Sequence, residues 1–179
     1  MSKTLIVNLF GSPGAGKSRG AAYIFSRLKT LNVNVELVTE FAKEKYWEGS
    51  SKVFDNQAYI FGEQYFRITR LLNEVDVIVT DSPIALSAFY NHSERLGERF
   101  NEMVIHTFNS YDDYQLNYLL KRSVPYNPKG RFQTESQSDN LYYQMSNFLY
   151  DHNISFLEVL GDDFHYDVIV EDIMNRIKQ

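Results

Sequence analysis

The chain has 179 residues, of which 44% are hydrophobic and 15% are aromatic, and it contains no cysteine. This length and composition fit one globular domain, which we expect to cover residues 1–179. The lack of cysteine excludes disulfides and thiolate metal sites, and it suits a cytoplasmic protein. The formal net charge of −5 argues against a general affinity for nucleic-acid backbones. No segment is apolar for long enough to cross a bilayer, so we expect no membrane partner.

Short apolar runs alternate with longer amphipathic patterns along the whole chain. Helices are expected where apolar residues recur at steps of three and four, near residues 21–31, 58–72 and 166–177. The alternation predicts βαβ units, and therefore an α/β three-layer sandwich with a central parallel sheet between helices. The five expected strands cover residues 5–10, 33–38, 75–80, 114–120 and 155–159.

A glycine-rich segment connects the first strand to the first helix, in the arrangement of a Walker A phosphate-binding loop. Backbone N–H groups of such a loop, together with the N-terminus of the helix, bind the phosphates of ATP or GTP. The lysine would reach the β- and γ-phosphates, and the last serine would ligate Mg²⁺. A glycine-rich turn that binds nothing is the alternative, which the strand–loop–helix context disfavours. The loop residues are Gly11, Ser12, Pro13, Gly14, Ala15, Gly16, Lys17 and Ser18.

Two residues that follow the second strand are candidates for contact with the substrate that accepts the phosphoryl group. Glu40 should emerge at the same edge of the sheet as the loop, where its carboxylate would accept a proton from an acceptor hydroxyl. An exposed glutamate in the first turn of a helix is the alternative. Phe41 would stack on a base or sugar, although packing in the core explains it equally well.

Asp81 follows the third apolar run, at the carboxyl end of a strand, where open α/β sheets bind their ligands. In a Walker B role it would hold Mg²⁺ together with Ser18. The alternative is an aspartate that caps the helix beginning near Pro83.

Residues 123–140 are polar and contain two prolines and a glycine, which predicts a loop that closes over the site as a lid. Arg122 ends the fourth strand and Arg131 lies within this loop. Both guanidinium groups would neutralise charge on the transferred phosphoryl oxygens. Solvated loop charges are the alternative.

With these motifs placed, nearly the whole chain resembles small P-loop kinases of the nucleoside and nucleotide kinase group. More narrowly, it is similar to a phage and bacterial AAA-type ATP-binding branch related to nicotinamide riboside kinase domains. The resemblance rests on GSPGAGKS at 11–18, VTEFAKE at 38–44, the helix from Asn56 through Gln64 and Arg67, TDSP at 80–83, and RSVPYNPKGRFQTES at 122–136.

The resemblance implies an ATP- and Mg²⁺-dependent kinase, with Arg67 and Phe41 at the acceptor. Some phage members of the group look like kinases for 5-hydroxymethyl pyrimidines in DNA, including 5-hydroxymethyluracil, so the leading acceptor is such a base. A nucleoside or a nucleotide is also open as the acceptor. If DNA binds, a strip of arginines would contact its backbone, formed by Arg67, Arg70, Arg95 and Arg99.

Two other classes remain open at this point. A hydrolytic ATPase or GTPase switch would use water in place of an acceptor, although no Asn-Lys-x-Asp guanine element is present. A non-catalytic nucleotide-binding module would act through a partner. Oligomeric state is not predicted, because an apolar helix face serves a core or a dimer equally well.

Overall fold

A computed structural model describes residues 3–111, 114–127 and 134–178. In these residues five parallel strands form one sheet in the order β2-β3-β1-β4-β5. The predicted parallel α/β sheet is confirmed, although three strands begin two residues later than expected. The strands are β1 (Leu5–Phe10), β2 (Val35–Val38), β3 (Val77–Thr80), β4 (Gln115–Lys121) and β5 (Leu157–Leu160).

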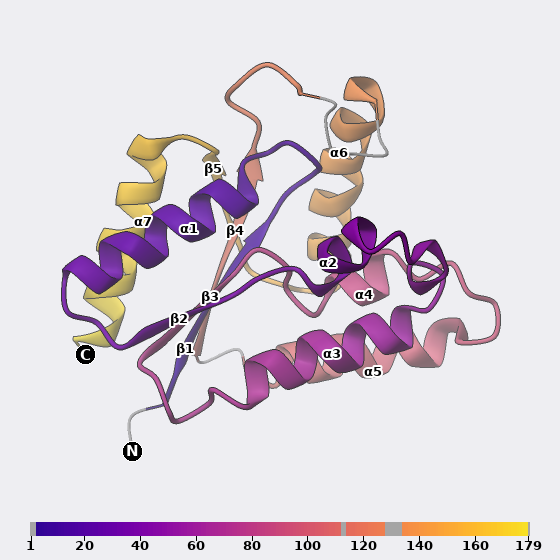
Figure 1. Cartoon of the computed structure of the whole chain (residues 1–179), viewed down its shortest axis with the longest axis horizontal. Coiled ribbons are helices and arrows are strands. Elements are labelled where there is room, and N and C mark those ends of the chain that lie inside the picture. Colours follow the sequence, from indigo (N-terminus) through magenta and orange to yellow (C-terminus); the bar gives the residue numbers. More distant parts are fainter. Residues whose placement is uncertain (1–2, 112–113, 128–133, 179) are drawn as a thin grey trace.

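Helices cover both faces of the sheet, which confirms the three-layer arrangement (Figure 1). Helices α1 (Lys17–Thr30) and α7 (Asp163–Ile177) cover one face. The last four helices of the next list cover most of the other face. A short helix and a 3₁₀ turn come before these four in the chain. These elements are α2 (Phe41–Trp47), η1 (Ser51–Val53), α3 (Gln57–Thr69), α4 (Leu86–Phe89), α5 (Gly97–Asn109) and α6 (Glu135–Asp151).

The central strand β1 shows why the sheet forms between two helical layers. All six of its residues are buried. Successive side chains of a strand point to opposite faces, and Ile6 and Phe10 accordingly join the core beneath α3 to α6, whereas Val7 and Leu9 join the core beneath α1 and α7. A strand that is apolar on both faces is stable only when both faces are covered.

The strand order decides which segments meet the loop that follows β1. Strands β3 and β4 pair directly with β1 on its two sides. Because all three strands run in the same direction, their carboxyl ends open onto one edge of the sheet. Residues that follow β3 and β4 therefore lie beside the glycine-rich loop.

Side-chain caps begin three of the helices. The Asn56 side chain accepts a hydrogen bond from the Tyr59 N–H at the start of α3. Asp162 accepts one from the His165 N–H at the start of α7. Thr134 and Gln137 form a reciprocal capping box at the start of α6.

This capping box corrects the expected extent of the lid. The predicted loop covered residues 123–140, but α6 begins at Glu135. A threonine followed three residues later by glutamine is a helix-start signal, and here it outweighs the polar composition of the segment. None of the helices in the described ranges is long and apolar enough to span a membrane.

Candidate functional site

The glycine-rich loop lies between β1 and α1, and its backbone has a conformation that requires glycine. Gly11, Gly14 and Gly16 have φ angles of 149°, 89° and 99°. Residues with a side chain rarely adopt such angles. A Cβ on Gly11 would also lie 2.9 Å from the Leu120 carbonyl oxygen and 3.0 Å from the Ala15 Cβ. The loop therefore has the tight curvature that brings backbone N–H groups toward a phosphate.

Two C-terminal helices hold this loop in place. From α6, the buried Ser138 hydroxyl lies 2.7 Å from the Pro13 carbonyl oxygen and 3.1 Å from the Ser12 hydroxyl oxygen. From α7, the Tyr166 hydroxyl donates to the Gly16 carbonyl at 3.1 Å. Sequence reasoning missed both supports, because each contact joins residues more than 120 positions apart and no local pattern encodes it.

Gly161 contacts the loop even more closely. It precedes α7, and a Cβ built on it would lie 2.0 Å from the Ala15 carbonyl oxygen. Only glycine allows the two backbones to approach to this extent. The signal that could have suggested this role is a glycine between a strand and a capped helix.

Lys17 is the first residue of α1, and its side chain folds back over the loop. Its Nζ donates to the Gly11 carbonyl at 2.6 Å and to the Ser12 carbonyl at 3.4 Å. The ammonium group is thus held at the backbone of the glycine-rich loop, and its role in phosphate binding stays a prediction. Ser18 follows in the first turn of α1 and is exposed.

Asp81 directly follows β3 and is buried, with 3% of its surface exposed. Its Oδ1 atom is buried and has no hydrogen-bond partner among the described residues. A buried carboxylate oxygen without a partner is costly, and a bound cation would remove that cost. The alternative role as a helix cap does not apply, because the N-cap of α4 is Ala85.

Glu40 is the N-cap residue of α2 and is half-buried, and its side chain makes no capping hydrogen bond. Burial raises the pKa of its carboxyl, the nearby Asp81 raises this pKa further, and the positive charge of Lys17 opposes both. Burial also raises the pKa of Tyr90 to about 12, with a contribution from the Glu40 charge. Lys17 and Asp81 therefore both act electrostatically on Glu40, and the roles expected for the three residues stay predictions.

Phe41 and Arg67 come together at the start of α2. The Phe41 ring is only 4% exposed and packs edge-on against Tyr59, with a centroid distance of 5.3 Å. The Arg67 guanidinium lies 5.0 Å from the Phe41 ring centroid and forms two hydrogen bonds with Glu44, at 2.7 and 2.8 Å. This ion pair raises the pKa of Arg67 and lowers that of Glu44. Roles for Phe41 and Arg67 at an acceptor stay predictions.

Gln64 of α3 ties the start of α2 to the end of β3, which the sequence did not predict. Its side-chain oxygen accepts from the Phe41 N–H at 3.1 Å, and its Nε2 donates to the Thr39 carbonyl at 3.4 Å. Nε2 also lies 3.5 Å from the Thr80 hydroxyl. This buried amide fixes the backbone on both sides of Glu40.

Arg122 follows β4 and is largely buried, with 15% of its side chain exposed. Its Nη2 lies 2.6 Å from Asp139 and 3.1 Å from Glu135, both on α6. Arg131, the second predicted lid arginine, lies outside the described residues.

The predicted arginine strip for DNA is not continuous. Helices α3 and α5 run in the same direction (Figure 1). Arg70 follows the last turn of α3 and Arg99 lies in the first turn of α5, so the two residues lie at opposite ends of this helix pair. Arg67 is paired with Glu44.

A parallel sheet whose first strand leads into a glycine-rich loop, a lysine and a helix defines a P-loop nucleotide-binding protein. Comparison with protein families agrees: the sequence matches the AAA domain family over residues 6–165, and the chain belongs to this family of P-loop NTPases. A comparison with curated proteins finds no significant match.

Replacing Glu40 with glutamine is expected to stabilise the fold at neutral pH. Because burial raises the carboxyl pKa above its ordinary value of 4.5, the folded chain binds this proton more tightly than the unfolded chain. The ionised carboxylate therefore destabilises the folded state above the raised pKa, and this cost is absent below pH 4.5. Thermal unfolding of Glu40→Gln and wild type should show a higher melting temperature for the variant at pH 8. The difference should shrink as the pH falls toward 4.5.

Glu36→Gln is a matched control, because this side chain is 47% exposed and pairs with Lys29. It should give no such gain at pH 8. A Glu40→Gln variant that is no more stable than wild type at pH 8 would contradict the burial of this charge.

Proposed function

We propose that the protein is an ATP- and Mg²⁺-dependent kinase that transfers the γ-phosphoryl group to a hydroxyl or phosphate of a nucleoside, a nucleotide or a modified DNA base. The observation that supports the proposal is the unpaired, buried Oδ1 atom of Asp81 at the end of β3, together with the Lys17 ammonium group at the glycine-rich loop and the electrostatic influence of both residues on Glu40. A carboxylate with a raised pKa at the phosphate end of the site suits removal of a proton from an acceptor.

Each residue of the site has a distinct part in this reaction. The loop N–H groups and Lys17 bind and orient the triphosphate, and Arg122 neutralises charge on the transferred oxygens. Glu40 takes the proton of the acceptor hydroxyl as the new O–P bond forms and the bond to the β-phosphate oxygen breaks. Ser18 and Asp81 would hold Mg²⁺, and the unpaired buried Oδ1 of Asp81 fits this role. When bound there, the cation neutralises phosphate charge during transfer.

Phe41 and Arg67 would contact the acceptor, and two features support this role. Both are joined to the backbone around Glu40, through the α2–α3 ion pair and the Gln64 amide. An aromatic ring beside a guanidinium also suits a base with a polar substituent. Our leading acceptor, a 5-hydroxymethyl pyrimidine in phage DNA, rests on the family resemblance alone.

The test measures transfer of radiolabelled γ-phosphate from ATP with Mg²⁺. The acceptors are nucleosides, nucleoside monophosphates, nicotinamide riboside, and DNA with normal or hydroxymethylated pyrimidines. Label on one acceptor establishes the reaction and its substrate. Label found only as free phosphate, at the same rate with and without acceptor, favours an ATPase and contradicts the kinase. ATP binding without release of label favours a non-catalytic module.

A further inference from the structure

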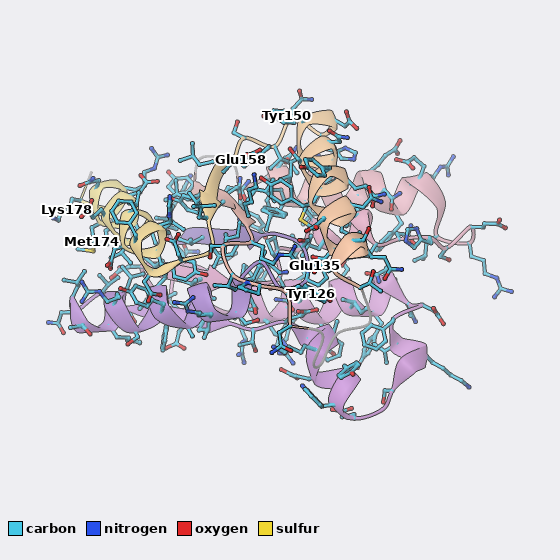
Figure 2. All side chains as sticks on the ribbon, turned by 90° about the horizontal axis from the view of Figure 1, so that it is seen from above. Tyr126, Glu135, Tyr150, Glu158, Met174 and Lys178 are labelled. Carbon is cyan, nitrogen blue, oxygen red and sulfur yellow. The ribbon has the colours of Figure 1, made fainter. Side chains whose placement is uncertain are left out.

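Two carboxylates on α6 hold one side of the Arg122 guanidinium. Both Glu135 and Asp139 contact Nη2, and neither contact involves Nη1. These two residues are four positions apart, so they lie on the same face of the helix. Tyr126 covers the guanidinium, with its ring centroid 5.3 Å from Cζ. Figure 2 labels Tyr126 and Glu135, which lie close together beside the start of α6.

The other side of the guanidinium is left without a partner. The Nη1 atom is buried and makes no hydrogen bond with any described residue. Leaving a buried charged donor unpaired is among the costlier features of a folded protein. The acidic side chains near it are already engaged with Nη2, so Nη1 needs a further acceptor, and an anion makes the strongest hydrogen bond with a guanidinium.

The start of α6 contacts both Arg122 and the phosphate loop. Ser138 lies between Glu135 and Asp139 in the sequence, and it is the residue that contacts Ser12 and Pro13. One turn of helix, closed by the Thr134 capping box, therefore contacts the loop and the arginine together. The capping box satisfies the N–H groups of Thr134 and Gln137 at the start of this turn.

We propose that Glu135 and Asp139 are positioning residues that hold the Arg122 guanidinium through Nη2, so that Nη1 pairs with a phosphate oxygen of the nucleotide when nucleotide binding displaces the groups that bury this atom. The inference rests on the proposed function and adds to it. Nη1 donates a charge-assisted hydrogen bond to the nucleotide, while the two carboxylates keep Nη2 and the plane of the guanidinium in place. The opposite arrangement, in which the carboxylates compete with the nucleotide for Arg122, predicts effects of opposite sign.

Asp139→Asn is expected to lower kcat/KM for phosphoryl transfer by roughly tenfold, because a misplaced catalytic group loses most of its effect. It should also weaken ATP binding several-fold and leave AMP binding unchanged. In a chain that already carries Arg122→Ala, Asp139→Asn should have no further effect on either quantity, since it acts through the arginine. Glu135→Gln should act in the same direction.

The control is Asp151→Asn, the same change at an exposed position at the other end of α6, which should leave transfer and binding unchanged. Unchanged or tighter ATP binding in Asp139→Asn would overturn the inference, as would an equal loss in the Arg122→Ala background. If wild type binds ATP but transfers no phosphate, the kinase proposal fails, and the ATP affinity of Asp139→Asn still decides the positioning role. If wild type does not bind ATP, both fail.

Discussion

Lys17→Ala is expected to lower the rate of phosphoryl transfer by about 10²–10³-fold while the fold stays intact, because removal of one preorganised donor from a transition state has an effect of this size. The lysine is the loop's own cation and lies 2.6 Å from the Gly11 carbonyl oxygen. Its loss leaves the core packing of α1 unchanged, since the buried residues of this helix are Gly20, Ala21, Ile24 and Leu28. Steady-state transfer kinetics and thermal unfolding on the same preparation test both parts.

Lys29→Ala is the matched control for this variant. Lys29 lies on the same helix, is 43% exposed, and pairs with Glu36 far from the loop. Its replacement should leave transfer unchanged. If Lys17→Ala transfers phosphate at the wild-type rate, this result would contradict both the phosphate-binding role of the loop and the kinase assignment.

Gly161→Ala is expected to weaken ATP binding and to lower the rate of phosphoryl transfer by roughly a hundredfold, because the new methyl group forces the loop out of place by a distance on the order of an ångström. The added Cβ would lie 2.0 Å from the Ala15 carbonyl oxygen, which belongs to the backbone and cannot rotate away. Part of the overlap will be relieved within the fold, at a cost to stability of about 1–3 kcal/mol. Titration calorimetry with ATP, transfer kinetics and denaturant unfolding measure the three effects separately.

The same substitution at Gly62 provides the comparison. This glycine lies in the interior of α3, and a Cβ there meets no atom within 4 Å. Gly62→Ala should leave ATP binding unchanged and stabilise the protein by about 0.5–1 kcal/mol, because alanine favours a helix over glycine. Equal ATP affinity in Gly161→Ala and Gly62→Ala would show that the approach of Gly161 to Ala15 is not required for nucleotide binding.

These two variants test two separate contributions to the loop, its own sequence motif and its support by a distant part of the chain. Lys17 belongs to the phosphate-binding segment itself and was predicted from its motif. Gly161 is about 150 positions away in the sequence and supports the loop only through the packing of the turn before α7. If Lys17→Ala loses transfer and Gly161→Ala loses ATP binding, the site depends on this support as well as on its motif.

Local patterns in the sequence determined the class of fold and the phosphate loop. Apolar runs of strand length alternating with helical patterns require a sheet covered on both faces, and the buried β1 strand meets that requirement. The spacing of glycines and lysine was equally informative, because residues with a side chain rarely adopt the φ angles that Gly14 and Gly16 have. Such signals are readable because each arises within a few neighbouring residues.

The tertiary structure alone decided which distant residues meet at this loop. The strand order places β3 beside β1 and so brings Asp81 to the loop, while Ser138 and Gly161 support the loop from the C-terminal third of the chain. The partners of Arg67 and Arg122 were also unforeseen, because periodicity shows which face of a helix is apolar but not which carboxylate a cation reaches. Contacts between residues so far apart follow from the packing of whole elements, which a single sequence does not display.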